Sequence, residues 1–345
     1  MSGPRIAVAG ATGLVGRRLL RIMEARGIPA QAIGVYASEA SAGDAISYAC
    51  QQLRIDALSN CNFSEFAAAL FCIGDELSAQ YVPQAQDAGC AVVDKSNAFR
   101  MDPDVPLVVA GVNDSAVLKQ HRLVANPNCT TIVMLHALAP LARDFGLKSL
   151  WAATYQSASG AGTAAVEQLR QDVGASGYES AENIRLVGKP ESLAFNTHCQ
   201  VGSLKPGGRC SEEQKLALET RKILGLGDLP VVVHTVRVPV LLGHGIAVTA
   251  RFDSAVEAEQ IIAAWDAAAD VLFMGDDIPT PVGSSRHERV ETGRLRREPD
   301  VDNGWSFFVT GDNINIGAAL NGWRLLELLQ AAGAVPQLAT ATGGK

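Results

Sequence analysis

The sequence predicts an α/β protein in which an N-terminal doubly wound parallel sheet is followed by a second, α+β domain. The chain has 345 residues, more than one hydrophobic core usually supports, so two domains are expected. Apolar strand-like runs alternate with helical stretches as far as residue 127, which is the pattern of a parallel sheet. Longer helices and strands follow residue 127 and indicate the second domain.

The first domain, residues 1–127, is expected to begin with a strand at Arg5–Ala9 and a helix at Arg17–Arg26. Gly27 and Pro29 end this helix, because glycine and proline disfavour its continuation. The elements expected next are strands at Ile33–Ala37, Ala68–Ile73, Cys90–Val93, Leu107–Ala110 and Leu123–Ala125, and a helix at Glu76–Ala88.

The second domain, residues 128–312, is expected to contain an antiparallel or mixed sheet, with its clearest strands at Val231–Val240 and Ile246–Phe252. Its helices are expected at Thr130–Arg143, Thr163–Val173 and Ala255–Ala268. A leucine-rich helix within residues 313–332 is expected to complete the first domain. Residues 333–345 are small and rich in glycine and threonine, which predicts a disordered tail.

Charge and cysteine content argue against several classes of protein. The net charge is −7 and there is no dense block of lysine and arginine, so neither nucleic acid nor a membrane surface is expected as a partner. No apolar run approaches the ~18 residues of a membrane span, and the N-terminus lacks the pattern of a signal peptide, so a cytoplasmic location is expected. The seven cysteines include no C-x-x-C pair, and His198-Cys199 has no further ligands nearby. Neither disulfides nor a metal is therefore expected.

Asn126-Pro127-Asn128-Cys129 places a cysteine directly before an apolar helical pattern. The first N–H groups of a helix lack internal partners and the helix dipole is positive there, so a thiolate at Cys129 is favoured. Such a thiolate is a nucleophile. The alternative is a small buried side chain, which is what most free cysteines are.

Gly10, Gly13 and Gly16 follow the first strand directly and open the first helix. In this context the glycines allow a pyrophosphate to approach the helix N-terminus closely, which predicts a Rossmann-type dinucleotide site. The spacing differs from the commoner G-x-G-x-x-G, so a turn that only packs the helix on the strand is the alternative. After the second strand, where the cofactor ribose is bound, Glu39 is present and arginine is absent. Glu39 suits a 2′-hydroxyl group or is a solvated loop acid.

Short segments spread over nearly the whole chain together carry a family resemblance. They are Gly10–Gly16, Asn97–Arg100, Asn126–Thr131, Thr154–Gln156, Ser159–Gly162, Ala194–Asn196, Glu212–Lys215, Arg237–Val240 with Gly243-His244, and Gly311–Asn313. In this order they resemble the bacterial aspartate-β-semialdehyde dehydrogenase family, from Gly10 to about Leu329. Such a set is far more specific than any single motif.

The resemblance implies NADPH-dependent reduction of L-aspartyl 4-phosphate to L-aspartate 4-semialdehyde and phosphate, in the biosynthesis of lysine, methionine, threonine and diaminopimelate. Cys129 would form a thioester with the acyl group. His244 would act as general acid/base, taking the thiol proton and later protonating the departing sulfur. Gln156 would help to place the acyl group. An ordinary strand-end histidine is the alternative for His244.

The likeness also assigns groups that bind the substrate. Arg237 would hold the substrate carboxylate with its planar fork. Glu212 would pair with the α-ammonium group, and Arg100 and Lys215 would bind the leaving phosphate. Asn128 is assigned to substrate binding as well. Without the family, an i,i+3 surface pair is the simpler interpretation of Glu212 and Lys215.

For the cofactor, the likeness implies NADP. The residues assigned to it are Gly10, Thr12, Gly13, Leu14, Val15, Gly16, Ser38, Ala40, Ser41, Ser159, Gly160 and Asn313, the last three near the nicotinamide. The family often reads Ala-Arg-Ser after its second strand, where arginine and serine grip the 2′-phosphate. Here Ala40 and Ser41 occupy the places of that arginine and serine, so weaker discrimination and some use of NAD are expected.

The second domain is expected to form a homodimer, as the family implies, and the other partners are a small-molecule substrate and inorganic phosphate. Departures from the family pattern at Lys95, Gly111 and Ile316 indicate a diverged member. Two alternatives stay open. One is a relative that reduces another acyl phosphate or an acyl-CoA, and the other is a catalytically silent paralogue that acts by binding.

Overall fold

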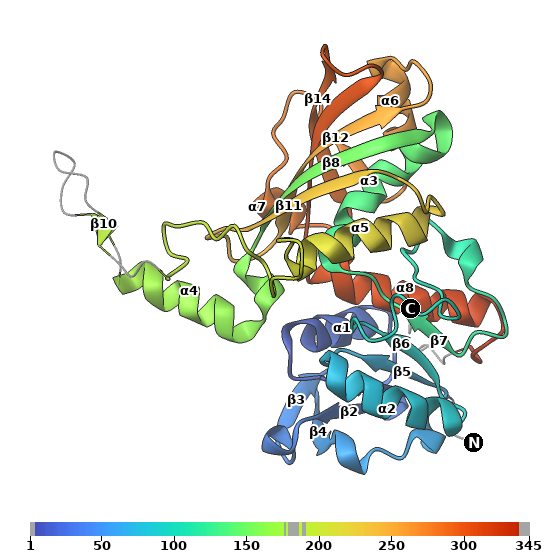
Figure 1. Ribbon diagram of the computed structural model, residues 1–345. Coiled ribbons are helices and arrows are strands. Elements are labelled where there is room, and N and C mark those ends of the chain that lie inside the picture. The colour runs from blue at the N-terminus through green and yellow to red at the C-terminus, as the bar shows by residue number, and fades with distance from the viewer. Residues whose placement is uncertain (1–3, 176, 179–185, 188–190, 338–345) are drawn as a thin grey trace. The chain divides into compact units, whose positions relative to one another are not determined.

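The structure, a computed structural model, describes residues 4–175, 177–178, 186–187 and 191–337. The chain divides into two compact units: unit 1, residues 1–128 with 318–345, and unit 2, residues 129–317. Each unit is built on its own sheet (Figure 1). The predicted class, a parallel sheet with helices followed by a second α+β part, is confirmed.

The sheet of unit 1 has seven strands in the order β3-β4-β2-β1-β5-β6-β7. Six run parallel and β3 is antiparallel to β4. Their bounds are β1 (Ile6–Ala9), β2 (Ile33–Ala37), β3 (Ala45–Tyr48), β4 (Gln51–Ala57), β5 (Ala68–Phe71), β6 (Ala91–Asp94) and β7 (Leu123–Ala125). The strand order reverses at β1, and dinucleotides bind outside the carboxyl ends of the strands at such a switch point.

Three long helices belong to this sheet: α1 (Leu14–Ala25), α2 (Asp75–Asp87) and α8 (Leu320–Ala331). The chain passes from β1 to β2 in one direction across the sheet and from β5 to β6 in the other. Because such crossovers are right-handed, α1 and α2 cover opposite faces. Helix α8 packs against α1 and contacts β6 (Figure 1). A π-helical turn at Asn315–Ala319 precedes α8, so the predicted C-terminal helix is regular only from Leu320 onward.

The strand predicted at Leu107–Ala110 is wrong, because only an isolated bridge joins Leu107 to Ala125. An amide side chain takes the place of a neighbouring strand there. Oδ1 of Asn321 accepts from the N–H of Ala110 at 2.8 Å, and its Nδ2 donates to the carbonyl of Val108 at 3.1 Å. The segment is therefore held by a residue of α8.

The predicted tail is ordered at its start. Ala334 and Val335 are buried, and Nη1 of Arg122 donates to the carbonyl of Ala334 at 2.6 Å. The prediction of a disordered tail is therefore wrong for its first residues. Residues 338–345 of the predicted tail lie outside the described part of the chain.

Unit 2 contains a six-stranded sheet in the order β11-β8-β12-β15-β14-β13. The bounds are β8 (Leu147–Gln156), β11 (Val231–Arg237), β12 (His244–Phe252), β13 (Val271–Phe273), β14 (Val290–Glu298) and β15 (Gly304–Gly311). The outer pairs, β11–β8 and β14–β13, are parallel, and the pairs between them are antiparallel. The sheet is therefore mixed, which is one of the two arrangements expected from the sequence. A separate hairpin pairs β9 (Gly177–Tyr178) with β10 (Leu186–Val187).

Helices cover one face of this sheet. They are α3 (Cys129–Phe145), α5 (Ser211–Leu224) and α6 (Ala258–Asp266), and α3 contacts both of the others as well as β8, β12, β14 and β15. Helix α3 is buried from Thr130 to Leu141, with Ala139 half-buried, which suits a sequence that is apolar on every side there. Two further helices are α4 (Thr163–Ala175), which packs against the 3-10 turn after β8, and the short α7 (Pro281–Ser284), which contacts β14 and β15.

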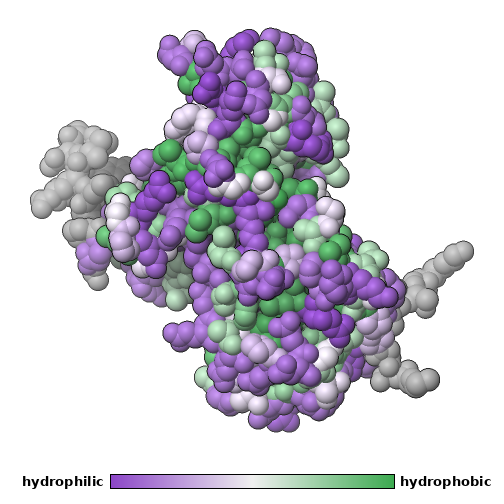
Figure 2. Space-filling model, turned by 45° about the vertical axis from the view of Figure 1, so that its right-hand side comes forward, coloured by the Kyte–Doolittle hydropathy of each residue, from purple (hydrophilic) through white to green (hydrophobic). Residues whose placement is uncertain are grey.

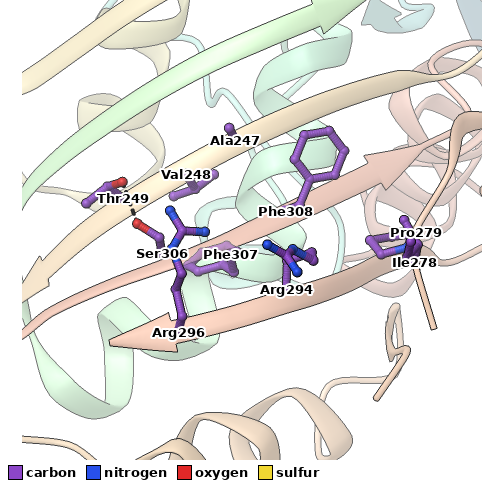
Figure 3. Close-up of a pocket in the computed structure, with 10 residues that line it drawn as sticks. All are labelled: Ala247, Val248, Thr249, Ile278, Pro279, Arg294, Arg296, Ser306, Phe307 and Phe308. Atoms are coloured by element: carbon purple, nitrogen blue, oxygen red, sulfur yellow. Dashed lines mark hydrogen bonds between the residues drawn. The ribbon is translucent and has the colours of Figure 1, made fainter. Parts of the chain in front are cut away.

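The other face of the sheet carries exposed aromatic and aliphatic side chains. Trp151, Tyr155 and Val232 are each 41% exposed. Figure 3 shows a hollow on the sheet, lined by Phe308 of β15 and by Arg294 of β14, among others. On the face of the molecule drawn in Figure 2, hydrophilic surface predominates and apolar areas lie between. No helix within the described residues is long and apolar enough to cross a membrane.

Candidate active site

Cys129 and His244 come together in unit 2. Cys129 is the first residue of α3, and His244 is the first residue of β12. The Sγ atom lies 3.3 Å from Nε2 of His244, although 115 positions separate them in sequence. Cys129 is partly exposed, and His244 is fully buried. A thiolate at this helix start is favoured by the positive end of the helix dipole.

The second ring nitrogen of His244 faces the end of β8. The backbone N–H of Ser157 donates to Nδ1 at 3.1 Å, and Oγ of Ser157 lies 3.2 Å from the same atom. Hydroxyl groups of Ser157 and Ser159 donate to Oδ1 of Asn313 at 3.2 and 3.1 Å. The N–H of Gly243 also donates to this oxygen, at 2.9 Å. Ser159 and Asn313, both predicted to contact the cofactor, therefore support the imidazole.

Electrostatics keep the imidazole neutral. Complete burial lowers the pKa of His244 to about 3, and the nearby charge of Arg237 adds to this shift. Burial also lowers the pKa of Arg237 itself, and the charges of Cys129 and Glu212 partly offset that effect. Arg237 nevertheless stays charged, since an arginine titrates far above neutral pH.

Arg237 and Gln156 stand at the carboxyl ends of neighbouring strands. They are paired residues in the parallel ladder of β11 and β8. Nη1 of Arg237 donates to the carbonyl of Ser157 at 2.7 Å, and the buried Gln156 donates to Oγ1 of Thr154 at 3.3 Å. A Cβ on Gly160 would lie 2.8 Å from Nη1 of Arg237. The predicted glycine therefore leaves room for the guanidinium group.

Glu212 and Lys215 lie one turn apart near the start of α5. Their side chains form an ion pair at 3.3 Å, as the simpler interpretation expects. The Glu212 side chain is only 14% exposed, however, and its charge acts on Arg237. Glu213 caps the same helix, because its Oε2 accepts from the N–H of Cys210 at 2.9 Å.

Arg100 and Asn128 belong to unit 1 and are both buried. Arg100 donates through Nε to the carbonyl of Asn126 at 3.0 Å and through Nη2 to that of Lys95 at 2.7 Å. The turn before the nucleophile is held from α8, where Nδ2 of Asn321 donates to Oδ1 of Asn126 at 2.9 Å.

The glycine turn of unit 1 has the form of a cradle. Gly10 has a φ of +82°, and a Cβ there would overlap the carbonyl oxygen of Cys72. A Cβ on Gly16 would overlap the carbonyl of Gly10. Gly13, the N-cap of α1, has no side-chain cap and no close neighbour except Gly10. The helix N-terminus is therefore open to an anion. The other predicted residues of this turn, Thr12, Leu14 and Val15, are half-exposed.

A short 3-10 turn at Glu39–Ser41 follows β2. Ser38, Glu39 and Ala40 are exposed and Ser41 is half-exposed. The hydroxyl group of Ser59 donates to the Glu39 carboxylate. Glu39 is thus a fixed acid at the end of the second strand, where Ala40 supplies no positive charge.

The sequence did not single out Ser157, although it lies between two of the quoted segments, Thr154–Gln156 and Ser159–Gly162. Gly317 was missed as well. A Cβ on Gly317 would lie 3.2 Å from the carbonyl oxygen of Cys129, so the glycine permits the close approach of the two segments. No cluster of potential metal ligands occurs among the described residues.

Comparison with known proteins agrees with this geometry. Residues 5–120 match the family described as "Semialdehyde dehydrogenase, NAD binding domain", and residues 138–316 match "Semialdehyde dehydrogenase, dimerisation domain". An aspartate-semialdehyde dehydrogenase from Aquifex aeolicus is 35% identical over 340 residues, covering 96% of this chain and 100% of the relative. One from Corynebacterium melassecola is 38% identical over 343 residues, covering 94% and 98%.

A solved structure agrees as well. The crystal structure of aspartate semialdehyde dehydrogenase II from Vibrio cholerae, complexed with ASA, superposes with a TM-score of 0.88 at 32% identity. It covers 96% of this chain and 99% of its own. The chain therefore belongs to the aspartate-semialdehyde dehydrogenase family.

Proposed function

We propose that this protein reduces L-aspartyl 4-phosphate to L-aspartate 4-semialdehyde and phosphate, with a nicotinamide cofactor as the reductant. The observation that carries the proposal is the 3.3 Å approach of Cys129 Sγ to His244 Nε2 at a helix N-terminus, beside Arg237. The relatives named aspartate-semialdehyde dehydrogenase, which align over nearly the whole chain, support it. They favour this substrate over another acyl phosphate or an acyl-CoA.

Cys129 is the nucleophile of the proposed reaction. Its thiolate adds to the acyl carbon, the bond from carbon to the phosphate oxygen breaks, and a thioester remains on the enzyme. The cofactor, when bound, supplies the hydride that reduces this thioester. The carbon–sulfur bond then breaks, and its electron pair returns to Cys129. His244 lies beside the sulfur throughout this sequence.

The substrate is held by charged groups. Arg237 binds its carboxylate, since a planar guanidinium group matches a carboxylate in a bidentate manner. Glu212 pairs with its ammonium group, and Arg100 and Lys215 bind the phosphate. Gln156 and Asn128 place the acyl group. The partial burial of Glu212 and its electrostatic effect on Arg237 support these two assignments.

The cradle at Gly10, Gly13 and Gly16 fits the pyrophosphate that NADP and NAD share. We assign Thr12, Leu14 and Val15 to the same site, and Ser38, Ala40 and Ser41 to the ribose. Ser159, Gly160 and Asn313 are assigned to the nicotinamide end. Units 1 and 2 then correspond to a dinucleotide-binding domain and a catalytic domain.

The open face of the unit 2 sheet is proposed as the contact of a homodimer. Trp151, Tyr155 and Val232 are exposed there, and contiguous exposed apolar surface marks an interaction site. The description of residues 138–316 as a dimerisation domain supports this assignment. A cytoplasmic location is also proposed, because all seven cysteines are free thiols, as a reducing compartment keeps them.

One assay tests the activity. The purified protein is given L-aspartate 4-semialdehyde, inorganic phosphate and NADP or NAD, and formation of the reduced cofactor is followed. Phosphate-dependent reduction is expected for the wild type, and Cys129→Ser should lower turnover by several orders of magnitude. Intact-mass measurement should show a covalent acyl adduct on the wild type alone. An adduct that persists on Cys129→Ser would refute the assignment of the nucleophile, and absence of phosphate-dependent reduction would refute the proposed reaction.

A further inference from the structure

Strand β11, which carries Arg237, is an edge strand of the unit 2 sheet. An edge strand presents N–H and C=O groups that no neighbouring strand pairs. Here two residues from other segments bind some of these groups. The N–H of Thr235 donates to Oε1 of Glu213 at 3.3 Å, and the N–H of Arg237 donates to the carbonyl of His198 at 2.8 Å. A carboxylate of α5 thus takes the place of a neighbouring strand at Thr235.

The same carboxylate also caps α5. Oε2 of Glu213 accepts from the N–H of Cys210 at 2.9 Å, and Cys210 is the N-cap residue of the helix. One side chain therefore binds a donor at the helix start and a donor in the strand, through its two oxygens. The Oγ1 atom of Thr235 also lies 3.0 Å from Sγ of Cys210, and both of these residues are buried. The start of α5 is thus fixed to β11 by two contacts.

These contacts join the two charged groups that are assigned to the amino and carboxylate groups of the substrate. Glu212 directly precedes Glu213 in α5. Arg237 comes two positions after Thr235 in β11, and alternate residues of a strand point to the same face. Because the Thr235 side chain contacts Cys210, the Arg237 side chain is on the face of the sheet that α5 covers. The charge of Glu212 acts on Arg237 there, partly offsetting the lowering of the arginine pKa by burial.

We propose that Glu213 is a positioning residue that fixes the spacing between Glu212 and Arg237, and thereby the preference for a substrate with an ammonium group beside its carboxylate. The inference rests on the proposed function, in which Glu212 pairs with the ammonium group and Arg237 with the carboxylate. Both substrate groups are bonded to one carbon atom, so the two side chains that bind them must stand at a set separation. A helix that shifted along the strand would keep one contact and weaken the other.

Helix α6 offers a matched control, because it has a cap of the same kind without a bond to a strand. The Oε1 atom of Gln260 accepts from the N–H of Glu257 at 2.9 Å, and Glu257 is the N-cap residue of α6. Gln260 stands at the same helix position as Glu213, the third after the N-cap. Gln260→Ala therefore removes one cap bond and leaves the connection between α5 and β11 in place.

The first test measures this connection in the free, full-length protein. Hydrogen exchange is followed by mass spectrometry of peptides that contain β11, residues Val231–Arg237. In Glu213→Ala the N–H of Thr235 loses its acceptor, so we expect one amide of this strand to exchange about tenfold faster than in the wild type. Gln260→Ala should leave the exchange of the strand unchanged. Equal exchange of the strand in Glu213→Ala and the wild type would overturn the proposal.

The second test measures specificity with two substrates in the phosphate-dependent assay. 4-Oxobutanoate has the aldehyde and the carboxylate of L-aspartate 4-semialdehyde but no amino group, so it offers Glu212 no ammonium group to bind. In Glu213→Ala, KM for L-aspartate 4-semialdehyde should rise about tenfold, the scale of one weakened charge-assisted contact, and kcat should change less. KM for 4-oxobutanoate should change little. Glu213→Gln should lie between the wild type and Glu213→Ala, because an amide has only one oxygen to accept from the two N–H groups.

Gln260→Ala should keep the KM of the wild type for both substrates. An equal rise in KM for the two substrates in Glu213→Ala, or no rise for either, would contradict the role in specificity. If the wild type turned over neither semialdehyde, the proposed reaction would be refuted, and the role in specificity with it. Hydrogen exchange needs no substrate, so it would still decide whether Glu213 joins α5 to β11.

Discussion

Gly160 and Arg237 are so close that a Cβ on the glycine would lie 2.8 Å from Nη1 of the arginine. The same Cβ would lie 3.1 and 3.2 Å from Cε1 and Nε2 of His244. One absent side chain therefore leaves space for both the proposed carboxylate-binding group and the imidazole beside Cys129.

Gly160→Ala is expected to displace the Arg237 guanidinium group, because the anchored imidazole has less freedom to move. KM for the semialdehyde should rise about ten- to a hundredfold, which corresponds to the loss of one charge-assisted hydrogen bond. Steady-state kinetics at saturating phosphate measure this. Gly174→Ala is the control, since Gly174 lies in α4 with nothing near its Cβ position. An unchanged KM in Gly160→Ala would show that the Arg237 guanidinium group can shift without weakening substrate binding.

Arg237→Lys should also act mainly on KM. Lysine keeps the charge but loses the planar fork, and it loses the geometry of the bond to the Ser157 carbonyl. We expect a larger effect on KM than on kcat, measured with the semialdehyde as substrate. Arg170→Lys on the exposed surface of α4 serves as the control. If kcat fell while KM stayed constant, Arg237 would have to act in the transition state.

Some of the helices and strands of this protein could be predicted from the sequence, and others could not. Their apolar residues predict β2 and α3 well, because β2 buries every second residue and α3 buries a long apolar run. Strands β3 and β4 were not predicted, since each buries only two residues, too few to give a clear apolar pattern. The Leu107–Ala110 error has another cause: Asn321 supplies hydrogen bonds from more than 200 positions away.

The residues of the candidate site likewise could be predicted from the sequence only in part. Cys129, Arg237 and His244 were found because their residue types suit chemistry and their segments resemble a family. Ser157 acts through its backbone amide, which every residue except proline possesses, so residue type carries no signal. Gly317 likewise matters only through the segment that it approaches.

His244 is expected to make stability depend on pH. In the folded protein its pKa is lowered to about 3, whereas an exposed histidine titrates near 6.5. Below pH 6.5 the unfolded chain therefore binds a proton that the folded chain excludes, and the free energy of unfolding falls by about 1.4 kcal/mol per pH unit. Above pH 6.5 the contribution is fully present. The thermal midpoint of the wild type should thus drop more between pH 7 and pH 5 than that of His244→Gln. Equal drops would mean that His244 does not carry this linkage.

The open face of the unit 2 sheet predicts the oligomeric state. Trp151 and Val232 are paired across β8 and β11, and both are 41% exposed. Trp151→Glu would place a charge inside the proposed contact, where burial without a partner is unfavourable. Sedimentation equilibrium should show a dimer for the wild type and monomers for the variant. Leu77→Glu, at an exposed position of α2, should leave the dimer intact. A dimer that survives Trp151→Glu would place the contact elsewhere.

The ribose end of the cofactor site predicts a weakened preference for NADP. Two features act in the same direction, because Ala40 lacks the guanidinium group that neutralises a 2′-phosphate and Glu39 adds a negative charge. The Ser59 hydroxyl group holds the Glu39 carboxylate in place. One lost charge-assisted contact is worth roughly 1.5–3 kcal/mol, or about a ten- to hundredfold loss of preference. Hydroxyl groups of Ser38 and Ser41 remain as donors, so NADP should still bind.

Dissociation constants for NADPH and NADH, from titration of cofactor fluorescence, check this expectation without relying on turnover. Ala40→Arg should tighten NADPH binding about ten- to a hundredfold and leave NADH nearly unchanged. Glu39→Gln should favour NADPH more modestly, since it removes repulsion but adds no cation. Ala42→Ser, in the same loop, changes no charge and serves as the control. If the wild type bound NADPH a thousandfold more tightly than NADH and Ala40→Arg changed nothing, another residue would have to bind the 2′-phosphate. In that case the loop at residues 38–41 would not determine cofactor choice, and the contrast between Ala40 and the family arginine would have no bearing on selectivity.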